Sequence, residues 1–195
     1  FMGRILVTGG CGFIGSHTIV ELINHGFEVV CIDNLSNSDN AVLDGIYAIT
    51  GFRVKNYENS VTDRADLENI FHNENITGVI HFAALKSVNE SVHQPLLYYQ
   101  NNIIGLITLL EVMEKFNCHH FIFSSSCSVY GNSSEIPVTE KTPLAEPESP
   151  YARTKLIGEQ ILRDIANSNS LLKSIALRYF NPAGSHPSIL IGESP

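Results

Sequence analysis

The sequence has no apolar run of roughly 18 residues, the length at which a membrane-spanning helix becomes a candidate, and no short apolar leader. It is therefore predicted to carry neither a membrane span nor a signal peptide. Dense runs of lysine and arginine are also missing: 20 acidic residues outweigh 12 basic ones, for a net charge of −8. Nucleic acids and anionic membranes are poor candidate partners for such a chain.

Cysteine pairs with metal-ligand spacing, such as C-x-x-C, are absent as well. The four cysteines stand apart along the sequence, at Cys11, Cys31, Cys118 and Cys127. Four reduced thiols fit a cytoplasmic protein. No metal site is predicted, since no ligand spacing joins His81, His119 and His120.

Short β-rich runs alternate with longer helical patterns. Strands are predicted at residues 4–8, 27–33, 52–57, 78–82, 120–125 and 174–179, and helices at 13–24, 40–49, 65–73, 95–116 and 150–166. This alternation predicts an α/β domain over residues 1–195: a doubly wound, Rossmann-like parallel sheet of six or seven strands with helices on both faces. Ligands bind such sheets at the carboxyl ends of the strands. The Pro- and Glu-rich residues 135–150 are predicted to form a long functional loop.

A glycine-rich turn follows the first predicted strand. Gly10, Gly12 and Gly15 satisfy G-x-G-x-x-G, and starting from Gly9 the chain also satisfies G-x-x-G-x-x-G. Bare backbone there lets a pyrophosphate reach amides at the positive end of a helix. Asp33, 18 residues after Gly15, suits a ribose diol and would repel a 2′-phosphate, which favours NAD over NADP. The alternative is a tight strand–helix turn without a ligand.

The segment from Tyr151 to Lys155 is the second informative motif. A spacing of four places both side chains on one face of a helix. A neighbouring ammonium is expected to lower the pKa of the phenol from its ordinary value of about 10. Ser149 can cap this helix and Pro150 can start it, which places Tyr151 in the first turn, where the helix dipole adds to the effect. An ordinary surface pair is the alternative.

Three hydroxyls, those of Ser124, Ser125 and Ser126, end the fifth predicted strand. That position lies near the expected nicotinamide. Capping of the strand end is the alternative interpretation, and it is weaker for Ser126 than for the other two.

Five segments together resemble the extended short-chain dehydrogenases, and within them the UDP-glucose 4-epimerases. They are VTGGCGFIGSH at 7–17, HFAALKSV at 81–88, FIFSSSCSVYG at 121–131, SPYARTK at 149–155 and RYFNP at 178–182. The resemblance implies an enzyme that interconverts UDP-glucose and UDP-galactose with a tightly held NAD. It also implies a homodimer formed through the helices at 95–116 and 150–166.

The resemblance assigns roles to three catalytic residues. Tyr151 would remove the O4′ proton of the sugar while the C4 hydride passes to NAD. Lys155 would hold the nicotinamide ribose and tune the tyrosine, and Ser126 would hydrogen-bond O4′. The 4-keto sugar would then turn over and receive the hydride on its other face.

The remaining site residues are also implied by the resemblance. The NAD-binding set comprises Gly9, Gly12, Phe13, Ile14, Gly15, Asp33, Asn34, Asn37, Ser38, Ser60, Val61, Phe82, Ala83, Ala84, Lys86, Asn101, Ser124, Tyr151, Lys155 and Tyr179. The sugar nucleotide is expected at Lys86, Ser126, Tyr151, Phe180 and Asn181.

Two features depart from the family pattern. Where the family places an acid for the adenine amino group, this chain has Ser60, a poorer acceptor. The family also continues beyond the segment at 191–195 into a smaller domain that grips the uridine diphosphate. That substrate domain is expected to lie largely outside this chain, which alone should be weakly active or inactive.

Two other functions remain open. One is a nucleotide-sugar 4,6-dehydratase or another extended dehydrogenase. Dehydratases place acids directly after the strand-five hydroxyl, where this chain has Cys127 and Ser128. The other is a non-catalytic NAD-binding module, which often lacks the tyrosine or lysine that this chain retains.

Overall fold

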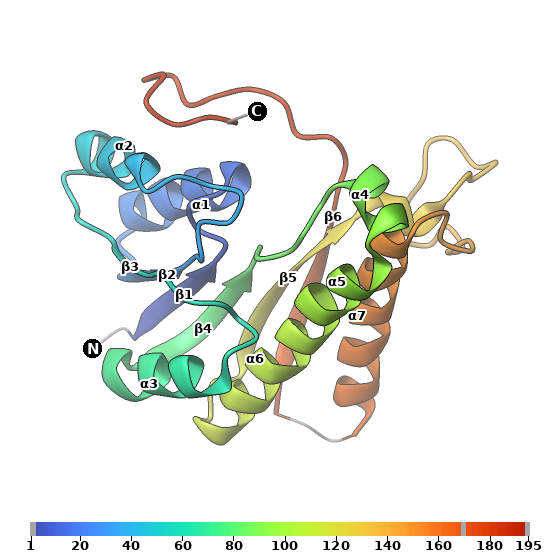
Figure 1. Ribbon diagram of the computed structural model, residues 1–195, viewed down its shortest axis with the longest axis horizontal. Helices are drawn as coiled ribbons and strands as arrows, with labels where there is room; N and C mark the ends of the chain where they lie inside the picture. Colours follow the sequence, from blue (N-terminus) through green and yellow to red (C-terminus); the bar gives the residue numbers. More distant parts are fainter. Residues whose placement is uncertain (1–2, 169–170, 194–195) are drawn as a thin grey trace.

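A six-stranded parallel sheet forms the centre of the computed structural model, which describes residues 3–168 and 171–193 (Figure 1). The strand order is β3-β2-β1-β4-β5-β6, and every neighbouring pair is parallel. The strands are β1 (Arg4–Thr8), β2 (Val29–Ile32), β3 (Lys55–Tyr57), β4 (Ile76–His81), β5 (His120–Ser126) and β6 (Lys173–Tyr179). The predicted doubly wound α/β fold is confirmed, with the loop after β1 where the strand order reverses.

Helices cover both faces of the sheet, as predicted. They are α1 (Phe13–Asn24), α2 (Ala41–Thr50), α3 (Arg64–Glu74), α4 (Val88–His93), α5 (Pro95–Tyr99), α6 (Gly105–Lys115) and α7 (Pro150–Asn167). In Figure 1, α1 and α2 lie on one side of the sheet, and α3, α6 and α7 lie on the other. No helix among the described residues is long and apolar enough to cross a membrane.

Several predicted boundaries were wrong. The helix expected at 95–116 is divided by a π-helical turn, η1 (Gln100–Ile104), and β3 begins at Lys55 because only three of its residues pair with β2. The sequence analysis also missed α4 and the 3₁₀ turn η2 (Cys127–Tyr130). A signal for α4 was present: Ser87 caps the amide of Glu90 at 3.2 Å, with the serine-to-glutamate spacing of a capping box.

Two apolar clusters lie on opposite sides of the sheet. Successive residues of β1 point to opposite faces, so Leu6 joins the cluster under α3 and α6, while Val7 joins the cluster under α1 and α2. The second cluster also contains Ile191, because the segment after β6 folds back over α1 and α2 (Figure 1). Of the segment at 191–195, positions 194 and 195 lie outside the described residues.

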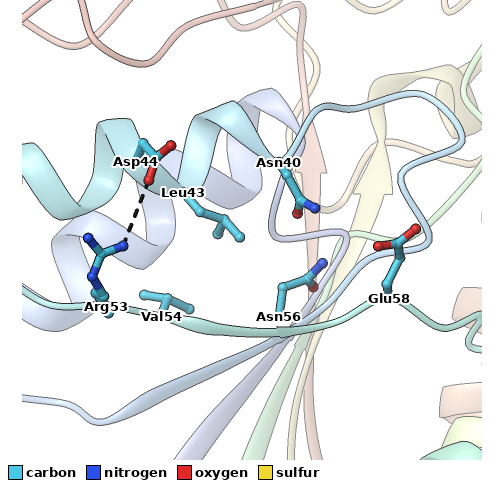
Figure 2. Close-up of a pocket in the computed structure, with 7 residues that line it drawn as sticks. All are labelled: Asn40, Leu43, Asp44, Arg53, Val54, Asn56 and Glu58. Carbon is cyan, nitrogen blue, oxygen red and sulfur yellow. Dashed lines mark ion pairs between the residues drawn. The ribbon is translucent and has the colours of Figure 1, made fainter.

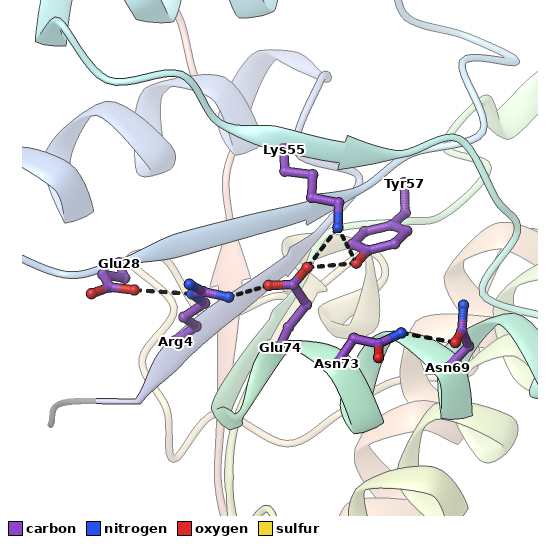
Figure 3. Close-up of polar contacts among 7 residues, drawn as sticks. All are labelled: Arg4, Glu28, Lys55, Tyr57, Asn69, Asn73 and Glu74. Atoms are coloured by element: carbon purple, nitrogen blue, oxygen red, sulfur yellow. Dashed lines mark hydrogen bonds and ion pairs between the residues drawn. The ribbon is translucent and has the colours of Figure 1, made fainter.

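A polar network closes the amino end of the sheet (Figure 3). Glu74, the last residue of α3, accepts hydrogen bonds from Lys55 at 2.8 Å and from the Tyr57 hydroxyl at 2.5 Å, and it also pairs with Arg4. Burial favours the protonated acid, but the bonds from Lys55 and Tyr57 outweigh it and lower the pKa of Glu74. The network joins β1, β3 and α3 at the amino end of the sheet, which is the end opposite the glycine loop.

Candidate functional site

Two glycines of the loop after β1 are required by the packing of the protein itself. Gly9 has a φ of +67°, and a Cβ there would lie 2.6 Å from the amide nitrogen of Ala83. At Gly15 a Cβ would lie 2.3 Å from the carbonyl oxygen of Gly9, so this glycine lets α1 pack against the turn. The loop is therefore held against the carboxyl end of β4.

Gly12 is different, because a Cβ there would meet the protein less closely than at Gly9 or Gly15. Its φ is −76°, and a Cβ would meet one protein atom within 4 Å, the Gly9 oxygen at 3.3 Å. Gly12 is also the N-cap of α1 and makes no side-chain cap, whereas α3, α4 and α7 are capped by Asp63, Ser87 and Ser149. An open, uncapped helix start fits an anionic pyrophosphate.

Asp33 connects the glycine loop to the loop that follows β2. Its Oδ2 accepts the amide of Cys11 at 3.0 Å, and its Oδ1 accepts the amide of Leu35 at 2.9 Å and the hydroxyl of Ser38 at 2.8 Å. Ser38, predicted to contact the ribose, thus already supports the carboxylate. A carboxylate has about four acceptor positions, so one remains here for a ribose hydroxyl.

The other residues predicted around the adenosine are placed less tightly. Asn34 accepts the amide and hydroxyl of Ser36, and Asn37 is exposed. Ser60 accepts the amide of Thr62 at 3.2 Å, so its hydroxyl caps the turn after β3. The Val61 side chain is packed in the core, which leaves only its backbone for a cofactor.

The segment after β4 lies beside the glycine loop. The amides of Phe82 and Ala83 donate to the carbonyl oxygen of Thr8 at 3.0 and 3.1 Å. Lys86 is exposed and forms an ion pair with Glu193 at 3.2 Å. The fold-back segment therefore reaches the lysine that the sequence analysis assigned to phosphate and ribose.

Asn102 is a residue that the sequence analysis missed. This buried side chain accepts the Leu85 amide at 2.9 Å and donates to the Leu85 carbonyl at 3.0 Å and to Thr154 at 3.1 Å. It joins the Lys86 segment to α7. Asn101, which was predicted, donates to the Asn102 side chain at 2.9 Å.

The start of α7 brings the predicted catalytic residues together. Ser149 caps the amide of Ala152 at 3.1 Å and Pro150 opens the helix, so Tyr151 lies in the first turn, as predicted. The Ser126 side chain, at the end of β5, faces the Tyr151 phenol and lowers its pKa. Lys155 donates to the carbonyl oxygen of Ser124 at 2.8 Å.

Burial dominates the electrostatics of this site. It raises the pKa of Tyr151, the Ser126 side chain opposes that rise, and Cys127 adds to it. Burial also lowers the pKa of Lys155 to about 8. The expected lowering of the tyrosine pKa was therefore wrong: the Lys155 ammonium lies 5.9 Å from the centre of the Tyr151 ring and donates to Ser124 instead, and burial raises the pKa of the phenol.

The end of β6 completes this edge of the sheet. The Tyr179 ring is half-buried 6.4 Å from that of Phe82, and the exposed Phe180 ring stacks on Tyr130 at 6.3 Å. Asn181 is exposed. His81 is a buried core residue between aromatic rings, with a pKa lowered by burial to about 3, so it is uncharged.

A separate cavity of about 360 Å³ lies between α2 and β3 (Figure 2). Leu43 and Val54 face each other across it, and Asp44 and Arg53 form an ion pair of 3.8 Å at one end. Asn56 lines it and donates to the backbone carbonyl of Asp33 at 3.3 Å. The cavity therefore lies next to the ribose-binding candidate and holds none of the catalytic candidates.

Known proteins with similar sequences and structures show which family has this geometry. Residues 5–192 match the model of the NAD dependent epimerase/dehydratase family. The chain belongs to this family. Within it, the chain is 49% identical over 194 residues to "UDP-glucose 4-epimerase 2" of Arabidopsis thaliana, covering 98% of this chain and 55% of the relative. It is 50% identical over 191 residues to the UDP-glucose 4-epimerase of Haemophilus influenzae, covering 98% and 56%.

Solved structures of the family share the fold. A UDP-glucose 4-epimerase from Bifidobacterium longum, in complex with NAD+ and UDP, superposes with a TM-score of 0.96 at 48% identity and covers 98% of this chain and 57% of that one. The enzyme from Brucella ovis, in complex with NAD, has a TM-score of 0.90 at 38% identity and covers 99% and 56%. These similarities confirm the resemblance drawn from the five motifs. The chain spans little more than half the length of the curated relatives that it matches.

Proposed function

We propose that the protein containing this chain interconverts UDP-glucose and UDP-galactose with NAD as its cofactor. One observation carries the proposal: the Tyr151 phenol faces Ser126 at the carboxyl end of the sheet, with a buried Lys155 one helical turn away that donates to the Ser124 carbonyl. The family match and the named relatives support it.

The chain supplies the groups that hold the cofactor and move a proton. Bound NAD supplies a hydride acceptor and donor at its nicotinamide. The open helix start at Gly12 takes the pyrophosphate, Asp33 the adenosine ribose, and Lys155 the nicotinamide ribose. Tyr151 takes the proton from O4′ of the sugar, while Ser126 orients that oxygen. Tyr151 returns the proton after the 4-keto sugar has turned over.

The chain forms the NAD-binding and catalytic domain of the enzyme under this proposal, and a second domain outside these 195 residues grips the uridine diphosphate. A cytoplasmic location is supported by four free cysteines, of which Cys11, Cys31 and Cys118 are buried.

A homodimer forms through the helices at 95–116 and 150–166, which correspond to α5, η1 and α6 and to α7. Several large apolar side chains are exposed in the first of these segments and in α4 just before it, those of Val88, Val92, Leu96, Leu97, Ile104 and Ile107. Exposed apolar groups in such number mark an interaction surface. Sedimentation at micromolar concentration should give a dimer, and a species that stays monomeric would contradict this part of the proposal.

One assay separates the candidate activities. The full-length protein is incubated with UDP-galactose, and the products are resolved by chromatography. UDP-glucose supports the epimerase, and a 4-keto-6-deoxy sugar nucleotide identifies a dehydratase. If the substrate is unchanged and NAD is bound, the protein is a non-catalytic NAD-binding module.

A further inference from the structure

A buried charge network under the carboxyl ends of β5 and β6 has no part in the proposed chemistry. Glu159 on α7 accepts two parallel hydrogen bonds from Arg178 on β6, at 2.9 and 2.7 Å. The same carboxylate accepts the Ser125 hydroxyl at 2.5 Å, and Arg178 donates to the Tyr130 hydroxyl at 2.8 Å. The side chains of Arg178 and Glu159 are only 18% and 6% exposed.

On the side of β5 and α7, the network borders the catalytic residues. Ser125 lies between Ser124, whose carbonyl accepts a hydrogen bond from the Lys155 ammonium, and Ser126, whose side chain faces Tyr151. Glu159 follows Lys155 by one helical turn. A bond from Ser125 to Glu159 therefore ties the strand that carries Ser126 to the helix that carries Tyr151.

On the side of β6, the network borders the substrate-binding candidates. Arg178 directly precedes Tyr179, and Tyr130 stacks its ring on Phe180 with an interplanar angle of 26°. The guanidinium thus contacts α7 with one edge and η2 with the other.

The chemistry of the pair favours a geometric role. Removing two charges from water carries a desolvation cost that an apolar pair of similar size avoids, so an ion pair here adds little net stability. A two-pronged contact between a guanidinium and a carboxylate, in contrast, fixes both distance and angle. The pair, together with the bond from Ser125, holds α7, β5 and β6 in one relative orientation.

We propose that Ser125, Glu159, Arg178 and Tyr130 form a positioning device that sets α7 against β5 and β6, so that the Tyr151 phenol meets Ser126 and Phe180 faces the sugar nucleotide. Glu159 and Arg178 are then positioning residues. The reaction that they serve rests on the proposed function, but the contact between Tyr151 and Ser126 does not.

The test follows the ionisation of Tyr151 in the full-length protein without substrate. The groups that face this tyrosine among the described residues are Ser126, Cys127 and Lys155. Tyrosinate absorbance is titrated for wild type and Glu159→Gln, each with and without Tyr151→Phe, so that the difference isolates Tyr151. Because the Ser126 side chain lowers the Tyr151 pKa, its displacement in Glu159→Gln should shift this titration upward.

Glu74→Gln is the matched control. Glu74 is as buried as Glu159, at 5% against 7% exposed, and it also pairs with cations, but at the opposite edge of the sheet. This variant should lose stability and leave the Tyr151 titration in place. If Glu159→Gln does not fold, Arg178→Lys serves instead, since it keeps the charge and loses the two-pronged contact. An unshifted Tyr151 titration in the variant that folds would overturn the proposal.

Measurements of kcat and KM test the two sides of the network separately. With UDP-galactose, Ser125→Ala should lower kcat more than it raises KM, and Tyr130→Phe should raise KM more than it lowers kcat. Equal changes in both variants would contradict the division. A wild type that does not epimerise would refute the proposed function, while the Tyr151 titration would still decide whether the network positions this residue.

Discussion

Burial is the main influence on the ionisation of both Tyr151 and Lys155. Burial raises the pKa of the phenol and lowers that of the ammonium to about 8, so both side chains are pushed toward their neutral forms. The spacing of four residues predicted one helix face, and Ser149 and Pro150 correctly predicted the first-turn position. It could not predict the degree of burial, which depends on β5 lying beneath the helix.

Tyr151→Phe should abolish epimerisation and leave NAD bound. The substitution removes only the phenolic oxygen, and the ring can still pack where it is. Turnover of UDP-galactose and the NAD content of the purified full-length protein are the two measurements. A variant with near-normal turnover would show that another group is the base.

Lys155→Met should weaken NAD binding and turnover, yet stabilise the fold at pH 7. The ammonium is buried at a cost on the order of 3 kcal/mol, as its pKa falls from 10.5 to about 8. Below about pH 8 the folded and unfolded states both carry the proton, so the cost is present in full. Between about pH 8 and 10.5 the unfolded chain binds more protons, and wild-type stability should rise with pH toward that of the variant.

Denaturant unfolding at several pH values measures this difference. Lys115→Met is the matched control, because Lys115 is 56% exposed and pairs with Glu68 on the surface. The control should change stability by about 0.5 kcal/mol or less. A Lys155→Met variant less stable than wild type at pH 7 would mean that the bond to Ser124 is worth more than the desolvation cost.

At the level of the elements, strand β1 and helix α1 were predicted with their observed bounds, since an apolar run and a glycine turn mark them locally. The pairing of Glu159 with Arg178 could not be predicted in this way. The two residues are 19 positions apart and meet only because α7 packs beside β6. Asn102 is another such case, because its partners come from the Lys86 segment and from α7.

The close approach of α7 to β5 depends on Gly158. A Cβ there would lie 2.6 Å from the ring of Phe123, which is 3% exposed. Alanine favours a helix over glycine by about 1 kcal/mol, but overpacking of this kind costs about 1–3 kcal/mol. Gly158→Ala should therefore destabilise the protein in thermal or denaturant unfolding, whereas Gln160→Ala, at an exposed position of the same helix, should not. A stabilised Gly158→Ala would show that the helix can shift freely.

At the scale of the whole molecule, the described chain holds the glycine loop and the catalytic residues, and β6 forms an edge of its sheet. That edge exposes Ile175 and Leu177, which are 59% and 39% exposed. We expect the second domain to pack against this apolar edge. Its position could not be predicted from the sequence, because it follows from the strand order.

The 195-residue chain by itself should fold, bind NAD more weakly than the full-length protein, and epimerise UDP-galactose very slowly or not at all. Without the domain that binds the uridine diphosphate, the binding energy of that part of the substrate cannot position the sugar at the nicotinamide. NAD titration and turnover of the two proteins, compared side by side, measure both effects. Equal turnover would show that the chain grips the nucleotide unaided.

Ile191 determines when its apolar cluster can be completed during synthesis. It packs in one cluster with Val7 and Cys11, although these residues come from opposite ends of the described chain. The glycine loop leaves the ribosome early, but the apolar cluster beneath it is complete only after residue 191 has left the ribosome. A stalled nascent chain that stops short of Ile191 should thus leave Cys11 reactive toward a thiol reagent that the released protein, in which Cys11 is 5% exposed, resists.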